Sequence, residues 1–279
     1  MTSFDAQYQA MVHAIMADGS EEMNERTGHV VRALPGKTLE IDDVSVDFSL
    51  LTLRRIPVKI FVAEQVWFLM GTRQESEMLG DYTHIWSSFA QPNGIVAAAY
   101  GYRWRHHFHR DQIEELVQLL ERDSSSRHGV VMAWDPSSDG LASGIQRKNI
   151  PCPIAFVVNI IGGRLHMHNI VRSNDVMLGL PHDVAGYCLL QHILAQRLHV
   201  KPGKYTHSIS HAHIYDSHFD AAQELTHRLP NHAPIALSLP LNAYERALAG
   251  DRELVDEIVG AFEMSYRPQA GLAKLDLIK

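Results

Sequence analysis

The pattern that most restricts the fold of this chain is a pair of apolar runs within residues 153–173. They are joined by Gly162 and Gly163, and a glycine pair between apolar runs is typical of a tight turn. We therefore expect two buried strands that are hinged at these glycines. Residues 204–215 alternate between apolar and polar side chains, which predicts another strand. Any fold of this chain has to accommodate these long strands.

Helical segments are mixed with these strands along the chain. The run VKIFVAEQVWFLMG (58–71) follows Pro57 and ends at Gly71, which is the usual punctuation of a helix. Apolar residues at helical spacing predict further helices. We expect helices over residues 4–18, 58–71, 111–121 and 184–199, strands over 39–50 and 126–134, and a turn-rich loop over 135–144.

The order of these segments indicates one α+β domain over residues 1–279. We find no internal repeat and no low-complexity linker, and we expect residues 72–95 to form a small insertion. Because 46% of the residues are hydrophobic and 20% are charged, the composition is that of an ordinary globular protein, and disorder is not expected.

The charge and the cysteine content exclude several classes of protein. A net charge of −7 argues against non-specific nucleic-acid binding, which needs a basic face. No apolar run is long enough to cross a membrane, and the first residues lack the pattern of a signal peptide. The only cysteines are Cys152 and Cys188, which is typical of a reducing compartment. We predict a cytoplasmic protein that binds neither nucleic acid nor membranes.

Two residues in apolar surroundings have both a structural and a catalytic interpretation. Cys152 stands between prolines in Ile-Pro-Cys-Pro, where it can be a small buried hydrophobic residue or a nucleophile that a nearby cation activates. Glu64 lies inside the apolar helix at 58–71, where a lone acid usually faces solvent. The residues alone leave both alternatives open.

Residues 171–187 combine a cation, a hydroxyl, acids and a turn ahead of a helix. Arg172 and Ser173, at the end of a strand, can hold a phosphate through the guanidinium and the hydroxyl. Asp183, at the start of the helix, can be an N-cap or a functional acid.

Histidines also cluster near the end of the last predicted strand. His211 and His213 alternate, so they face one side of the strand, as two zinc ligands would. No cysteine or helical histidine motif completes a tetrahedral set. We therefore expect no metal site.

Eight motifs, in this order, resemble those of thymidylate synthase and its relatives, the pyrimidine nucleotide hydroxymethylases. The intervals between Cys152 and Arg172 and between Asp183 and His213 also follow the family pattern. The motifs are ERTG (25–28), AEQVWFLMG (63–71), HIW (84–86), AAYGYRWR (98–105), SRHGVVMAW (126–134), PC (151–152), VRSNDVMLGLPHDVAGY (171–187) and HAHIY (211–215).

This resemblance implies covalent chemistry on a pyrimidine base. Cys152 matches the nucleophile that adds to C6 of the base, which makes C5 nucleophilic. Glu64 matches the acid that organises water and proton transfers. Tyr100 matches a residue of the reaction pocket. On the resemblance, the candidate catalytic residues are Cys152, Glu64, Tyr100 and Asp183.

The resemblance also implies the ligand contacts. In the family, arginines hold the nucleotide phosphate and favour the thiolate, and one of them, matched here by Arg127, is donated across a dimer interface. His213 and Tyr215 match the pair that binds the sugar hydroxyl. The nucleotide-binding candidates are Arg26, Arg127, Arg172, Ser173, Asp183, His213 and Tyr215, and the folate-binding candidates are Trp86 and Asp175.

Asp183 departs from the thymidylate synthase pattern, which has asparagine at this position. An asparagine amide can accept from uracil N3–H and donate to O4, whereas an ionised carboxylate only accepts. Cytosine offers a donor at N4 and, when N3 is protonated, a second one. The aspartate therefore favours cytosine, and the cytosine hydroxymethylase branch of the family carries the same exchange.

Other departures surround the pocket. Pro153 replaces the histidine that follows the nucleophile. His128 replaces a paired arginine, which weakens the expected clamp on the phosphate. Residues 209–211, with His211 last, replace Gly-Gly-Asp. The tail FEMSYRPQAGLAKLDLIK lacks the family segment that folds over the folate.

From the resemblance we expect a thymidylate synthase-type α+β fold, in which a large bent mixed sheet, flanked by helices, packs against its twin in a homodimer. The expected activity is a cytidylate (CMP or dCMP) 5-hydroxymethylase with 5,10-methylenetetrahydrofolate as co-substrate. The alternatives are a thymidylate synthase, which reduces the transferred carbon with hydride from the folate, and a catalytically altered nucleotide-binding protein on the same fold.

Overall fold

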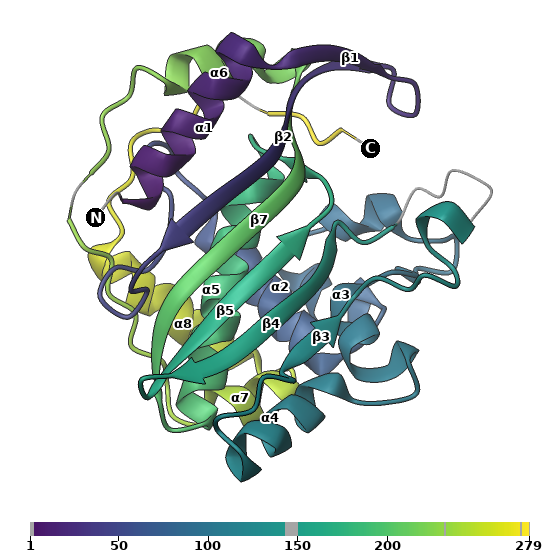
Figure 1. Cartoon of the computed structure of the whole chain (residues 1–279), viewed down its shortest axis with the longest axis vertical. Helices are drawn as coiled ribbons and strands as arrows, with labels where there is room; N and C mark the ends of the chain where they lie inside the picture. The colour runs from purple at the N-terminus through teal and green to yellow at the C-terminus, as the bar shows by residue number, and fades with distance from the viewer. Residues whose placement is uncertain (1–2, 143–149, 232, 274, 279) are drawn as a thin grey trace.

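The computed structural model describes residues 3–142, 150–231, 233–273 and 275–278. Its centre is a seven-stranded mixed sheet in the order β1-β2-β7-β5-β4-β3, with β6 paired to β7 (Figure 1). β7 pairs parallel with β5 and β6, and the other neighbours are antiparallel. The strands are β1 Ser20–Asn24, β2 His29–Ile41, β3 Val130–Met132, β4 Pro153–Ile161, β5 Arg164–Val171, β6 Asn174–Asp175 and β7 Lys201–Tyr215.

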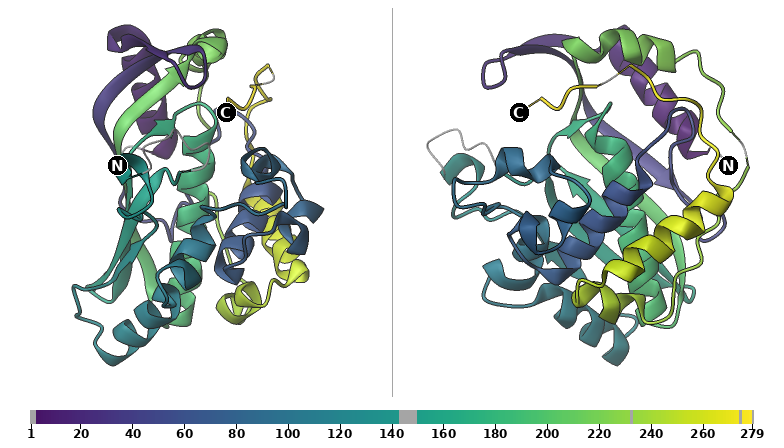
Figure 2. Two further views of the ribbon diagram at one scale, coloured as in Figure 1. Left: turned by 90° about the vertical axis from the view of Figure 1, so that its right-hand side faces the viewer. Right: turned by 180° about the vertical axis from the view of Figure 1, so that it is seen from behind.

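Helices gather on one side of this sheet and leave its other face uncovered (Figures 1 and 2). The mixed sheet with flanking helices confirms that part of the expected α+β fold. None of the helices in the described ranges is long and apolar enough to span a membrane. The helices are α1 Phe4–Asp18, α2 Val58–Met70, α3 Tyr100–Tyr102, α4 Gln112–Arg122, α5 Gly179–Arg197, α6 Phe219–Leu225, α7 Ala243–Leu248 and α8 Arg252–Ser265.

The glycine-hinged strand pair is confirmed as the hairpin β4–β5. Ile161 pairs with Arg164, and the two residues between them, Gly162 and Gly163, have φ angles of 60° and 71°. A two-residue hairpin turn of type I′ needs positive φ at both positions, which glycine adopts without strain. The hairpin therefore brings the residue before β4, Cys152, next to the end of β5.

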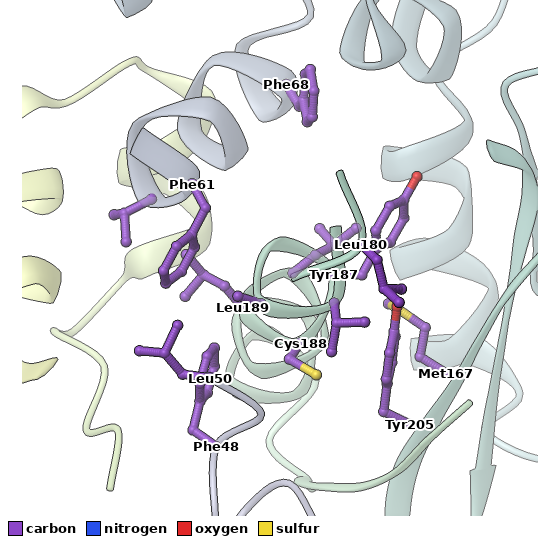
Figure 3. Close-up of a cluster of buried hydrophobic side chains, with 14 of the residues drawn as sticks. Phe48, Leu50, Phe61, Phe68, Met167, Leu180, Tyr187, Cys188, Leu189 and Tyr205 are labelled. Carbon is purple, nitrogen blue, oxygen red and sulfur yellow. The ribbon is translucent and has the colours of Figure 1, made fainter. Parts of the chain in front are cut away.

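Helix α5 forms the middle of the core. Figure 3 shows its residues between two groups of buried side chains: Phe48, Leu50 and Phe61 on one side, and Met167 and Tyr205 of the sheet on the other. Gly186 of α5 lies so close to Gln65 of α2 that a Cβ atom there would come within 2.7 Å of the amide nitrogen. This close packing holds α2, and with it Glu64, against the first turns of α5.

Three predicted elements have different bounds in the structure. The strand expected at 39–50 continues only to Ile41, because the alternating apolar residues beyond it anchor a loop whose Phe48 packs on Phe61 and Phe262. The strand expected at 126–134 is only β3. These corrections have one physical reason: burial of alternate side chains produces the pattern of a strand even where the backbone has no ladder partner.

The helix expected at 184–199 begins earlier, at Gly179, and ends at Arg197. Pro181 falls in its first turn, where the backbone N–H that proline lacks has no partner within a helix. Leu178 is the N-cap, so the interpretation of Asp183 as an N-cap is wrong. The segment 72–95, where we expected an insertion, contains short 3₁₀ turns at Glu75–Glu77, Leu79–Asp81 and Ile85–Phe89, joined by irregular backbone.

Candidate functional site

A cavity of about 570 Å³ opens where the ends of β5, β6 and β7 meet the first turns of α5. All of the predicted site residues except Arg127 line this cavity, although they lie far apart in the sequence. The residues that it brings together are Arg26, Glu64, Trp86, Tyr100, Cys152, Arg172, Ser173, Asp175, Asp183, His213 and Tyr215.

Cys152 is held in the cavity by its neighbour across the hairpin. The backbone N–H of Arg172 donates to the Cys152 carbonyl at 2.9 Å. The Arg172 guanidinium donates to the carbonyls of Pro151 and Ile150 at 2.9 and 3.2 Å. The strand end that carries Arg172 thus sets the position of the thiol, while the remaining guanidinium N–H groups are available to a ligand.

The arginines near Cys152 favour the thiolate, as the resemblance implies, but they do not outweigh burial. Burial raises the pKa of the Cys152 thiol above its ordinary value, although Arg172, Arg26 and a hydrogen bond from Tyr100 act in the opposite direction. Arg172 has the larger effect of the two cations, and even together with Arg26 it does not outweigh the loss of hydration. In the free protein the thiol is therefore protonated at neutral pH.

Glu64 faces the cavity from α2, so the interpretation of this acid as solvent-facing is wrong. Trp86 Nε1 donates to Glu64 Oε1 at 2.6 Å. Burial raises the pKa of Glu64 to about 8, despite the Trp86 hydrogen bond, which lowers it. A carboxyl group with such a pKa can both give and take a proton near neutrality, as a general acid and base must.

Trp86 is itself held firmly at the wall of the cavity. Glu75 accepts hydrogen bonds from the backbone N–H groups of Trp86 and Ser87, at 2.8 and 3.1 Å, and from the Ser87 hydroxyl. The Trp86 ring meets Tyr100 edge-on, with centroids 5.2 Å apart. Glu75 was not among the sequence candidates, and its role follows only from this contact with the backbone of Trp86.

Asp183 projects into the cavity from α5, five residues after its N-cap. Its Oδ2 accepts a hydrogen bond from Asn174 Nδ2 at 2.8 Å. Burial raises the pKa of Asp183 to about 7, with Asp175 adding to this effect and Asn174 opposing it. Asn174 was also missed by the sequence analysis, although it stands inside the 171–187 motif.

The opposite end of the cavity is rich in histidine. His213 and Tyr215 are buried, and their rings meet at 89° with centroids 5.0 Å apart. His211 Nδ1 lies 3.4 Å from His213 Nδ1. Burial lowers the pKa of His213, so this residue is neutral near pH 7. Neutral histidine and tyrosine side chains can bind a hydroxyl group by either donating or accepting.

Asp175 has a structural contact as well as a place on the cavity wall. Its Oδ1 accepts the backbone N–H groups of Met177 and Leu178, at 2.9 and 3.2 Å, and so shapes the turn that leads into α5. Ser173, in the short connection between β5 and β6, lines the cavity beside Arg172.

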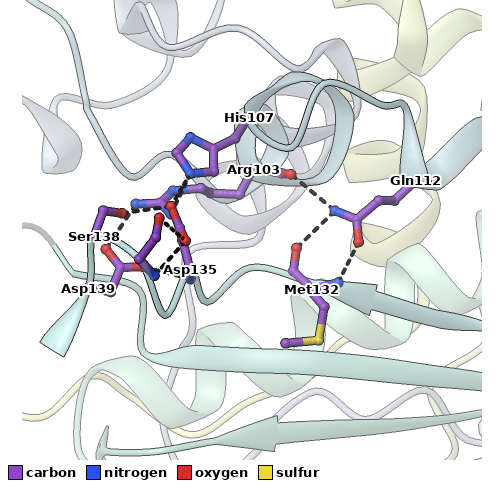
Figure 4. A network of polar contacts seen from close by, with 8 residues as sticks. Arg103, His107, Gln112, Met132, Asp135, Ser138 and Asp139 are labelled. Atoms are coloured by element: carbon purple, nitrogen blue, oxygen red, sulfur yellow. Dashed lines mark hydrogen bonds and ion pairs between the residues drawn. The ribbon is translucent and has the colours of Figure 1, made fainter. Parts of the chain in front are cut away.

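Trp134 and Gly140 form a further wall that the sequence analysis did not single out. Gly140, with φ +55°, approaches the Trp134 ring so closely that a Cβ atom would lie 2.6 Å from it. Figure 4 shows the network behind this wall: Arg103 Nη2 is paired with Asp139 Oδ1 at 3.0 Å, and His107 Nε2 with Asp135 Oδ2 at 2.7 Å. We infer that this buried network holds the wall in place.

The end of the chain returns to the cavity. Leu277 and Ile278 are among its lining residues, and His218 Nε2 donates to the carbonyl of Asp276 at 3.0 Å. The tail therefore adds apolar surface to the cavity, although from its sequence we expected no family segment that folds over the folate. The sequence of the tail contains no motif from which its place at the cavity could be predicted.

Arg127 is the one predicted site residue that the fold does not bring to the cavity. It is exposed in the segment before β3 and does not line the cavity of its own chain. A role at an active site would require a second chain.

The sheet order, the cavity and its thiol and carboxyl groups define a protein that can perform covalent chemistry on a bound ligand. The sequence pattern of the family described as thymidylate synthase matches residues 6–257. The match covers most of the chain, and the chain belongs to the thymidylate synthase family. Members are one-carbon transferases that bind a pyrimidine nucleotide and use methylenetetrahydrofolate as co-substrate, which confirms the prediction of a transferase.

Proposed function

We propose that this protein is a cytidylate 5-hydroxymethylase that uses 5,10-methylenetetrahydrofolate. The observation that carries the proposal is the carboxyl group of Asp183, which lies in the same cavity as Cys152 and Glu64. At this position the thymidylate synthase pattern has an amide, which suits uracil. A carboxylate accepts from cytosine N4–H and from a proton on cytosine N3, and so suits cytosine.

The proposed reaction begins when Cys152 gives up its proton and its sulfur adds to C6 of the base. C5 then attacks the methylene carbon of the folate. Loss of the C5 proton and of the folate nitrogen leaves an exocyclic methylene on C5 and releases tetrahydrofolate. Water adds to this methylene, with Glu64 as the base that takes its proton. Departure of the Cys152 sulfur from C6 restores the pyrimidine ring, and no hydride is consumed.

The remaining cavity residues are assigned to binding. Arg26, Arg172 and Ser173 bind the nucleotide phosphate, and His213 with Tyr215 binds the sugar hydroxyl. Trp86 and Asp175 contact the folate, and Tyr100 donates to the Cys152 sulfur. Support for the phosphate assignment comes from the unused N–H donors of Arg172 beside Cys152.

Analysis of the products tests this proposal directly. With methylenetetrahydrofolate and CMP or dCMP, we expect a nucleotide that has gained one hydroxymethyl group, together with tetrahydrofolate. Mass spectrometry of the nucleotide and absorbance of the folate distinguish this from reductive methylation. Formation of dihydrofolate with dUMP, and no product with either cytidylate, would instead identify a thymidylate synthase.

We also propose that two chains form a homodimer through the uncovered face of the sheet. This face carries alternate residues of β5 and β7 that are only half-buried in the single chain, including His166, His168 and Ser208. A partner on this face would bring its Arg127 to the nucleotide phosphate.

Sedimentation should therefore report a dimer in solution. Arg127→Ala should weaken nucleotide binding without changing the sedimenting mass, because this side chain is exposed and contributes nothing to the fold of its own chain. A fully active monomer would contradict the shared site.

A further inference from the structure

A buried chain of hydrogen bonds extends from Asp183 into the sheet. Asn174 Nδ2 donates to Asp183 Oδ2 at 2.8 Å, and Asn174 Oδ1 lies 3.0 Å from His207 Nε2. His207 Nδ1 lies 2.8 Å from the hydroxyl of Tyr205. Asn174 is 3% exposed, and His207 and Tyr205 are fully buried. The three residues come from β6 and β7, and the roles assigned so far to the cavity do not use them.

The direction of this chain determines what Asp183 receives. With its amide N–H on Asp183, Asn174 turns its oxygen to His207, which must then donate from Nε2 and accept from Tyr205 at Nδ1. Burial lowers the pKa of His207 to about 3, so this histidine is neutral and carries one ring proton. The opposite amide orientation would place two oxygens together unless Asp183 were protonated. With an ionised Asp183, His207 and Tyr205 therefore complete the chain in the direction that makes Asn174 a donor to Asp183.

Burial and the neighbouring carboxylate of Asp175 oppose the ionisation of Asp183. Burial is the largest effect that raises its pKa, and the Asn174 hydrogen bond is the contact that lowers it. The titratable groups that face Asp183 are Glu64 on α2, Tyr100 on α3, Cys152 before β4, Asp175 on β6, Tyr187 on α5 and Tyr205 on β7. Of these groups, Asp175 raises the pKa of Asp183 through its charge, whereas the donated N–H of Asn174 lowers this pKa and favours the carboxylate.

The ionisation of Asp183 bears on base choice, because the proton shared between Asp183 and the base has a different position with cytosine than with uracil. Cytosine can carry the proton on N3 and leave Asp183 as a carboxylate that accepts from N3–H and N4–H. Uracil offers O4, which needs a donor, so Asp183 itself must keep the proton. An N–H donor stabilises an ionised acceptor more than a neutral one. The Asn174 bond therefore stabilises the complex with cytosine more than the complex with uracil.

We infer that Asn174, held by His207 and Tyr205, is a positioning residue that selects cytosine over uracil by stabilising the carboxylate form of Asp183. This inference rests on the proposed function, in which Asp183 reads the base. It adds a specificity determinant that acts through Asp183.

The variant Asn174→Leu tests the inference, because leucine has nearly the same shape without the amide. Dissociation constants for CMP, dCMP, UMP and dUMP are measured by calorimetry across pH on the folded protein without folate. Cytidylate affinity should fall as pH rises through the pKa of Asp183, since the complex needs one proton. Loss of the Asn174 bond raises that pKa, so the fall should move up by about one pH unit. The preference for cytidylate over uridylate should drop about tenfold.

Two further variants and a control make the outcome decisive. His207→Gln keeps an N–H donor toward Asn174 and should retain most of the preference for cytidylate. Tyr205→Phe removes only the hydroxyl group that contacts His207 Nδ1, and its effect should be smaller than that of Asn174→Leu. The control is Gln191→Met. It removes a different buried amide, that of Gln191 in α5, which donates to the Leu165 carbonyl at 2.8 Å, and it should leave the pH midpoint unchanged.

An unchanged pH midpoint and base preference in folded Asn174→Leu would overturn the inference and leave Asn174 a structural residue. If Asn174→Leu does not fold, the other two variants decide. The inference would then be overturned by two results together: an unchanged pH midpoint and base preference in Tyr205→Phe, and full loss of the preference in His207→Gln. A wild-type protein that prefers uridylate would instead overturn the proposed function, and this result is visible before any variant is made.

Discussion

Replacement of Cys152 by alanine should abolish turnover, with kcat/KM falling on the order of 10⁴-fold or more. The expected loss is this large because the proposed reaction has no other route to a nucleophilic C5. The variant should still bind nucleotide, since Arg172 holds this segment through backbone carbonyls that do not depend on the thiol. Steady-state kinetics and nucleotide titration measure the two properties separately.

The second cysteine provides a matched control. Cys188 is fully buried in α5, and burial raises the pKa of its thiol to about 12. Cys188→Ala should lower stability by removing a packed side chain and should leave the chemistry intact. A 5-fluoropyrimidine nucleotide with methylenetetrahydrofolate should trap an adduct on Cys152, because C5 cannot lose fluorine as it loses a proton. Substantial turnover by Cys152→Ala would contradict the covalent mechanism.

Asp183→Asn should change the base preference from cytosine toward uracil. The N–H of Asn174 would bind the oxygen of the new amide and direct its NH₂ group toward the position of uracil O4. A hydrogen bond to a charged partner contributes about 1.5–3 kcal/mol, and each 1.4 kcal/mol is about tenfold, so the preference should change by about tenfold to a hundredfold or more. The measurement is kcat/KM for CMP, dCMP, UMP and dUMP on both proteins.

A neighbouring acid separates this effect from a general change of charge. Asp175→Asn removes another carboxylate of the cavity. It should weaken folate binding and change the base preference far less than Asp183→Asn does, because Asp175 acts on Asp183 only through its charge. Equal preferences in the wild type and Asp183→Asn would remove the physical basis for cytosine. A structural role as helix cap does not compete with this interpretation, because Leu178 is the N-cap of α5.

The pattern of apolar residues was sufficient to predict the elements that are regular and buried. The β4–β5 hairpin, α1, α2, α4 and β7 lie where the spacing and the punctuation by proline and glycine place them. The predictions were wrong at residues 42–50, where a loop buries alternate side chains, and at the start of α5, where a first turn without regular apolar spacing precedes Val184. Local patterns report burial, and burial does not require a strand.

For this protein the sequence by itself determined the family, the hairpin that begins directly after Cys152, and most of the polar residues that line the cavity. The tertiary structure decided the chemical state of those residues. Cys152 has a raised pKa despite its arginines, Glu64 has a pKa of about 8, and Asp183 receives an N–H from Asn174. The physical reason is that ionisation and hydrogen-bond direction depend on desolvation and on partners such as His207 that lie far away in the sequence.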